Sequence, residues 1–137
     1  MKKVLVGGAF DLIHAAHVHT LNEAKKHGDY LIVSVLSDAR IIAKKGESRP
    51  IIPEEERRYM VGNIRCVDEV VTWPGPDYPV TGLIDMYKPN VIVVSGDNPV
   101  DLQSLCDERG IELVVISRIA VDSGLDTSGI IRKIKGE

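Results

Sequence analysis

The feature that most constrains the fold is the regular alternation of short apolar runs with segments of helical period. Five runs rich in Val, Ile and Leu are expected to form strands: residues 4–6, 30–36, 69–73, 91–95 and 112–117. Their apolar residues are nearly continuous, which is typical of parallel strands covered on both faces. Strands that alternate with helices form right-handed βαβ units. The sequence therefore predicts an α/β fold with an open, doubly wound, parallel five-stranded sheet and helices on both faces.

The segments between these runs carry helix signals. Val80, Leu83, Ile84 and Tyr87 have the i, i+3, i+4, i+7 spacing of an amphipathic helix, which Pro89 ends. Four further helices are expected: from His14 or Ala15 to near Gly28, from Pro53 with an acidic first turn, from Leu102 to a Gly110 cap, and from Thr127 with Ile130, Ile131 and Ile134 buried. The segment 38–50 is interpreted as a loop.

Composition excludes several classes of protein. A chain of 137 residues with 44% hydrophobic and 27% charged residues fits one globular domain, residues 1–137. The net charge of -3 argues against a protein that coats nucleic acid. No apolar run approaches the roughly 20 residues that span a membrane. Cys66 and Cys106 lie far apart without CxxC spacing, so we expect neither a disulfide framework nor a zinc ribbon. We therefore expect the protein in a reducing cytoplasm.

Histidines cluster just after the first predicted strand. In sheets of this kind ligands bind outside the carboxyl ends of the strands, and His14, His17 and His19 fall within six residues of each other there. His14 and His17 stand three apart and share a helix face, with Cβ atoms roughly 5–6 Å apart. His19 and His27 are expected at the surface. The first two histidines are therefore the candidate chemical groups.

The turn that precedes these histidines has the character of a phosphate loop. Gly7 and Gly8 let the backbone approach a ligand closely, and the N-terminus of the following helix favours an anion. A plain tight turn is the alternative. A zinc site is a rival use of the histidines, but the metalloprotease pattern needs histidines four apart with an intervening Glu, and Ala15 and Ala16 fill the gap here.

At these residues the sequence resembles a known superfamily. GGAFDLIHAAHVHTL is similar to the GxFDxxHxGHxxxL signature of the HxGH nucleotidyltransferases, the cytidylyltransferase-like superfamily. Later segments match that superfamily in content and order: SRPIIPEEERRYMVGNIRCVDEVV, PNVIVVSGD and SGLDTSGIIRKI. Above all the chain resembles the adenylyltransferase domain of ADP-heptose synthase, and archaeal FAD synthase and glycerol-3-phosphate cytidylyltransferase are also similar. The resemblance implies a Rossmann-like nucleotidyltransferase fold.

The resemblance also implies roles for individual residues. His14 and His17 would donate to phosphates and stabilise charge at the α-phosphorus, Lys44 or Lys45 would reach the phosphates, and Arg57 would match the family's helix arginine. The nucleotide would be bound by the first turn, by the segments after the fourth and fifth strands and by the start of the last helix: Gly8, Ala9, Phe10, Asp11, His17, Asp97, Arg118, Thr127 and Ser128. No metal ligand is assigned.

Two positions depart from the superfamily pattern. Ala16 occupies the place of the HxGH glycine, where an added methyl group changes how closely a substrate can approach. Arg118 matches the arginine that precedes the last motif, but the interval from it to Gly124 is longer than usual.

The implied activity is a transfer of AMP from ATP, with Mg²⁺, onto a phosphate-bearing acceptor, with release of pyrophosphate. The expected acceptor is a sugar phosphate, as in lipopolysaccharide core biosynthesis, and residues 73–79 and 38–50 are its expected loops. FMN is the alternative acceptor, and a non-catalytic nucleotide-binding module is the alternative class. The expected partners are small molecules, not nucleic acid or membrane, and a homodimer is an open alternative.

Overall fold

A computed structural model describes residues 1–96, 101–116 and 126–137 of the chain. Its strands are β1 (Lys3–Gly8), β2 (Tyr30–Leu36), β3 (Glu69–Trp73), β4 (Val91–Ser95) and β5 (Glu112–Ile116). Its helices are α1 (Ala15–Lys25), α2 (Asp38–Lys45), α3 (Glu54–Gly62), α4 (Val80–Tyr87), α5 (Leu102–Arg109) and α6 (Thr127–Ile134).

The strands form one parallel sheet in the order β3-β2-β1-β4-β5, which confirms the predicted α/β architecture. The chain adds strands on one side of β1 as far as β3, then crosses to the other side for β4 and β5. The strand order therefore reverses at β1, between its neighbours β2 and β4. Ligands of open α/β sheets bind at the carboxyl ends of the strands beside such a reversal.

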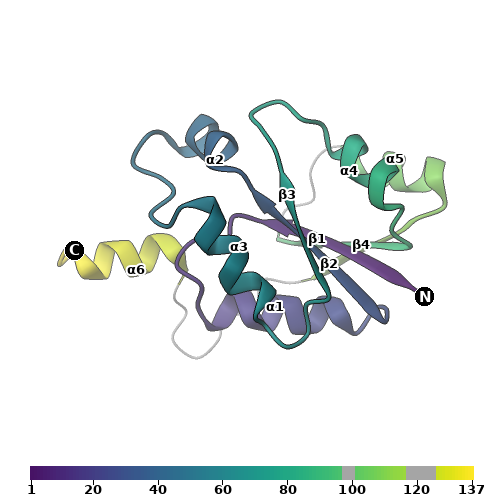
Figure 1. Cartoon of the computed structure of the whole chain (residues 1–137), viewed down its shortest axis with the longest axis horizontal. Coiled ribbons are helices and arrows are strands. Elements are labelled where there is room, and N and C mark those ends of the chain that lie inside the picture. Colours follow the sequence, from purple (N-terminus) through teal and green to yellow (C-terminus); the bar gives the residue numbers. More distant parts are fainter. Residues whose placement is uncertain (97–100, 117–125) are drawn as a thin grey trace.

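Helices cover the two faces of the sheet separately (Figure 1). Successive residues of β1 alternate between the faces, so Val4 and Val6 enter one core while Leu5 enters the other. The first core also holds Leu21 of α1 and Val61 of α3, and the second holds Leu83 of α4 with Leu102 and Cys106 of α5. The sheet is thus doubly wound.

Two expectations about helices were wrong. Residues 38–45 form helix α2 rather than a loop, because the Ser37 side chain accepts a hydrogen bond from the Arg40 N–H and caps the helix while Ile41 is buried. Helix α6 begins at Thr127 as predicted, but none of the three isoleucines expected to be buried is: Ile130 and Ile131 are half-buried and Ile134 is 76% exposed. Helix α6 extends outward beyond α3 (Figure 1). In the part of the chain that the structure describes, no helix is long and apolar enough to cross a membrane.

Candidate active site

The segment between β1 and α1 lies at the reversal of strand order and has an unusual backbone. Phe10 and Leu12 have positive φ angles of 53° and 49°. Side chains other than glycine rarely adopt this left-handed region, and such residues gather at functional sites. Phe10 is nevertheless buried, with its ring centroid 5.5 Å from that of His17. The surrounding packing thus holds the predicted phosphate loop in a strained conformation.

His14 and His17 are brought together and interlocked by the start of α1. The Nδ1 atom of His14 accepts a hydrogen bond from the Ala16 N–H at 3.3 Å, and the Nδ1 atom of His17 accepts one from the His14 N–H at 3.2 Å. This pattern is a capping box in which two histidines replace the usual Ser or Thr and Glu. The ring centroids lie 4.0 Å apart. Helix capping therefore fixes the position of both rings.

The same bonds decide which ring nitrogen carries the proton. A neutral imidazole has one N–H and one acceptor nitrogen, and in both rings the acceptor is Nδ1. Each neutral ring therefore presents an Nε2–H donor. The Nε2 atom of His14 is buried and has no hydrogen-bond partner among the described residues. It is a donor for which the described residues supply no acceptor.

His17 is held in its neutral form. Burial and, to a smaller extent, the neighbouring His14 lower its pKa from 6.5 to about 4, while the Asp11 carboxylate opposes both effects. At neutral pH this ring is consequently a hydrogen-bond donor without a positive charge.

Asp11 fixes the loop to the segment that precedes α3. Its two carboxylate oxygens accept hydrogen bonds from the backbone N–H groups of Ile52 and Ile51, at 2.9 and 2.8 Å. The side chain is 5% exposed. Asp11 is one of the nucleotide-binding residues that the resemblance implies. In this structure backbone N–H groups of the protein already bind both of its carboxylate oxygens.

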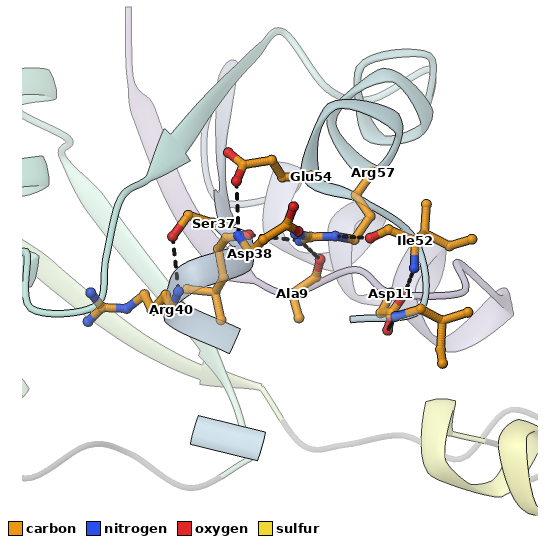
Figure 2. Close-up of polar contacts among 10 residues, drawn as sticks. Ala9, Asp11, Ser37, Asp38, Arg40, Ile52, Glu54 and Arg57 are labelled. Carbon is orange, nitrogen blue, oxygen red and sulfur yellow. Dashed lines mark hydrogen bonds and ion pairs between the residues drawn. The ribbon is translucent and has the colours of Figure 1, made fainter. Parts of the chain in front are cut away.

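Arg57 is buried and bonds four residues in three segments of the chain (Figure 2). Its Nε donates to the Ile52 carbonyl at 2.7 Å, and its Nη1 donates to the carbonyls of Ala9 and Leu36, both at 2.8 Å. Its Nη2 donates to Asp38 at 2.7 Å, in an ion pair. The resemblance implies that Arg57 matches the family's helix arginine. In this structure 1% of the residue is exposed, and its hydrogen bonds fix the end of β2, the first turn and the start of α2.

The N-terminus of α6 lies against the first turn, so Thr127 and Ser128 do come close to the predicted site. The Thr127 hydroxyl donates to the Asp11 carbonyl at 2.8 Å, and the Ser128 hydroxyl accepts from Arg49 Nη2 at 3.2 Å. Asp126, rather than Thr127, is the N-cap residue and accepts from the Gly129 N–H. Both hydroxyls therefore already have partners within the protein.

Other predicted site residues are less tightly placed. Lys44 and Lys45 are exposed in the last turn of α2. Asp97 and Arg118 lie outside the described residues. The surface prediction for His19 holds in part only, because that residue is half-buried and its Nε2 is buried with no partner in the described part of the chain.

The site also contains residues that sequence reasoning missed. Asp38, which pairs with Arg57, accompanies Ser37 in a recognisable helix-start pattern. Arg49 and Arg40 had no local signal, because their partners Ser128 and Trp73 are distant in the sequence. A largely apolar cleft of about 450 Å³ lies beside the first turn, between α3 and α6, and is lined by Phe10, Leu12, Ile13, Ile52, Glu56, Arg57, Tyr59, Met60 and Ile130.

The described residues do not offer a ready-made metal centre. Across residues 1–96, 101–116 and 126–137 there is no group of three or more His, Cys, Asp and Glu side chains that could hold a metal ion. The Nδ1 atoms of both histidines and both oxygens of Asp11 are occupied by backbone N–H groups.

Comparisons with known proteins agree with this fold. The family model described as Cytidylyltransferase-like matches residues 5–133, and the chain belongs to this family.

Two curated relatives illustrate the range within the family. The chain is 38% identical over 134 residues to the bifunctional protein HldE of Helicobacter acinonychis (strain Sheeba), and the match covers 98% of the chain but 28% of that protein. It is 40% identical over 119 residues to the FAD synthase of Ferroglobus placidus, covering 85% of the chain and 75% of that enzyme. The chain thus spans about a quarter of HldE and most of the FAD synthase.

Solved structures share this fold. The lipopolysaccharide core biosynthesis protein of Thermoplasma volcanium is 29% identical with a TM-score of 0.71, covering 85% of this chain and 95% of that one. A pantothenate synthetase of Thermus thermophilus shares the fold, with a TM-score of 0.68 at 12% identity over 95% of this chain and 61% of that one.

Proposed function

We propose that this protein transfers AMP from ATP to a phosphate-bearing acceptor, a sugar phosphate, and releases pyrophosphate. The observation that carries the proposal is the capped histidine pair, whose Nε2–H groups are prepared donors at the reversal of strand order. Phosphoryl and nucleotidyl transfers require mainly positioning and stabilisation of negative charge. Two fixed donors beside a helix N-terminus supply both.

In the proposed reaction, an oxygen of the acceptor phosphate attacks the α-phosphorus of ATP. The new bond joins that oxygen to the α-phosphorus, and the bond from the α-phosphorus to the bridging oxygen of the β-phosphate breaks. The electron pair leaves with pyrophosphate. His14 and His17 donate from Nε2 to oxygens of the reacting phosphates and stabilise the charge that gathers there. No covalent enzyme intermediate is required.

The triphosphate is proposed to lie along the first turn, with the N-termini of α1 and α6 toward its oxygens. The hydrogen bond from Thr127 to the Asp11 carbonyl supports this placement, because it brings the two helix starts to one loop. Asp97 and Arg118 are the proposed further contacts of the nucleotide, and Lys44 or Lys45 is proposed to reach the phosphates of the nucleotide or of the acceptor. Mg²⁺ enters as the counter-ion of ATP, which suits a chain whose described residues lack a metal-binding cluster.

A sugar phosphate is the proposed acceptor for two reasons. The match to HldE covers 98% of this chain, and a lipopolysaccharide core biosynthesis protein has the same fold at 29% identity. FMN is the second candidate, supported by the 40% identity to an FAD synthase. The proposed compartment is a reducing cytoplasm, where ATP is available and Cys66 and Cys106 remain free thiols.

The test is pyrophosphate release from Mg²⁺-ATP or Mg²⁺-CTP with a panel of acceptors that includes a heptose 1-phosphate, a hexose 1-phosphate and FMN. We expect release with ATP and a sugar phosphate, and its loss in His14→Asn and His17→Gln. If no nucleotide and acceptor pair releases pyrophosphate while calorimetry detects ATP binding, the protein is a non-catalytic nucleotide-binding module. Full activity in both histidine variants would refute the mechanism.

A further inference from the structure

One arginine organises the whole loop that follows β3. Residues 73–79 contain three prolines and one glycine, and three of their backbone carbonyls converge on Arg40 of α2. Its Nη1 lies 3.2 Å from the Pro74 carbonyl, 3.3 Å from that of Pro76 and 2.9 Å from that of Tyr78. Gly75 fits closely beside the arginine, because a Cβ atom there would lie 2.5 Å from the Arg40 Cβ. Figure 2 shows this side chain extending away from the Arg57 network.

The same guanidinium covers the single tryptophan. The Arg40 Cζ lies 4.2 Å from the ring centroid of Trp73, within the range of a cation–π contact. Trp73 Nε1 donates to the Tyr78 carbonyl at 2.9 Å, which fixes the indole in its plane. The ring also lies against β1, because a Cβ atom at Gly7 would be 3.4 Å from two of its carbons. The indole is therefore held between the protein's own cation and the strand that leads into the phosphate loop.

Two other aromatic rings, those of Phe10 and Tyr78, pack against the protein. Phe10 is 5% exposed and faces His17, and Tyr78 packs against the core on the α4 and α5 face. A flat aromatic ligand binds proteins by stacking on a free ring face. Phe10 is too buried to offer one, and the Arg40 guanidinium covers the face of Trp73 that it approaches.

This loop lies on the acceptor side of the proposed reaction. The proposed nucleotide contacts Asp97 and Arg118 follow β4 and β5, on one side of β1. Trp73 ends β3 and Arg40 follows β2, on the other side. Because Trp73 touches Gly7 beside the phosphate loop, a molecule that delivers its phosphate from the β2 and β3 side passes the covered indole.

We propose that Arg40 is a specificity-determining residue. It covers Trp73 and fixes the 73–79 loop. The enzyme therefore accepts a compact, non-aromatic phosphate such as a sugar phosphate and rejects a flavin phosphate. The inference rests on the proposed function and decides between its two candidate acceptors. Stacking on Trp73 would first require removal of the guanidinium from the ring and from three carbonyls.

The kinetic test compares wild type with Arg40→Ala and Arg40→Lys, using ATP with a heptose 1-phosphate or with FMN. In Arg40→Ala we expect the KM for the sugar phosphate to rise about tenfold, equivalent to about 1.4 kcal/mol, with little change in kcat or in the KM for ATP. The preference for sugar phosphate over FMN should fall. Arg40→Lys keeps the charge but lacks the planar fork, so it should restore the preference only partly. Arg58→Ala, which removes an exposed arginine of α3, is the matched control.

A binding test is independent of turnover. Trp73 is the chain's single tryptophan, so its fluorescence reports directly on stacking. FMN should leave this fluorescence unchanged in wild type and in Arg58→Ala after correction for absorbance, and should quench it in Arg40→Ala. Gly75→Ala, which forces the loop away from Arg40, should behave as Arg40→Ala does. Circular dichroism checks that each variant is folded.

The outcomes separate the two proposals. Absence of pyrophosphate with every acceptor refutes the proposed function, and the fluorescence result still decides whether Arg40 shields Trp73. Pyrophosphate release with an unchanged acceptor preference in Arg40→Ala, or FMN quenching in wild type as strong as in that variant, overturns the role of Arg40.

Discussion

His14 and His17 together cap the first turn of α1. The His17 Nδ1 accepts a hydrogen bond from the His14 backbone N–H at 3.2 Å, and the His14 Nδ1 accepts one from the Ala16 N–H at 3.3 Å. The bonds that start helix α1 are therefore the bonds that aim both Nε2–H donors. Capping and the proposed chemistry use opposite nitrogens of the same rings. Substitutions that preserve one function and remove the other are therefore possible.

His14→Asn is expected to separate the two functions. Asparagine is among the best N-cap residues, so stability should be retained, but the Nε2 donor is lost and kcat should fall about 100-fold. His14→Ala should lose the cap as well and cost about a further 1 kcal/mol of unfolding free energy. Urea denaturation and pyrophosphate release measure the two effects. A wild-type rate in His14→Asn would contradict the role of this ring.

Stability should fall on acidification because of His17. The unfolded chain binds a proton at this histidine near pH 6.5, whereas the folded protein resists protonation until about pH 4. Protons therefore favour the unfolded state within this window, so the contribution of His17 to stability decreases as the pH falls from 6.5 to 4 and changes no further below it. As the pH falls across that range, the urea midpoint of the wild type should decrease relative to that of His17→Gln. A difference that is independent of pH would contradict the lowered pKa.

Arg57→Ala should be strongly destabilising. The substitution leaves three carbonyls and the Asp38 carboxylate without their donor, and each buried polar group that loses its partner costs about 1–3 kcal/mol. Arg58→Ala, at the next position of α3 but exposed, should change stability by less than about 0.5 kcal/mol. Equal denaturation midpoints for the two variants would show that the guanidinium is not a structural centre.

Thr127→Val should loosen α6 without unfolding the protein. It removes the hydroxyl donor to the Asp11 carbonyl, and α6 has no buried side chain to compensate. Amide exchange in residues 127–134 should accelerate, and the KM for ATP should rise, while global stability changes by about 1 kcal/mol or less. Thr127→Ser retains the hydroxyl and is the control. Exchange in α6 equal to that of wild type would show that this bond does not hold the helix.

Removal of divalent cations should stop turnover and leave the substrate-free protein intact. The described residues contain no metal-binding cluster, so EDTA should abolish pyrophosphate release without lowering the melting temperature measured in the absence of ATP. A marked fall in that temperature would instead indicate a resident ion.

The strands could be predicted because their signal is local. Residues 30–36, 69–73 and 91–95 are strands with the expected bounds, since β-branched runs buried on both faces leave little ambiguity. Helix α2 escaped prediction because it buries one residue, Ile41. The burial of Ile134 was wrongly predicted, because helical period alone cannot say whether a neighbour covers that face.

The histidine pair could be located from sequence, but the bonds that orient it could not. The role of Arg57 was equally hidden. An arginine that follows three glutamates in a helix start suggests a surface residue, and its burial depends on carbonyls supplied by three other segments of the chain. Long-range partners of this kind have no local signal.

The buried guanidinium has a consequence for cooperativity. Arg57 joins α3 to the Ala9 carbonyl, 48 positions away along the chain, and to the Leu36 carbonyl, 21 positions away. A fluctuation that opens the first turn must break the hydrogen bond from Arg57 to Ala9. The same guanidinium also holds the end of β2 and the start of α2. The catalytic edge should therefore open as one unit, and its amides should share a single opening free energy rather than a graded series.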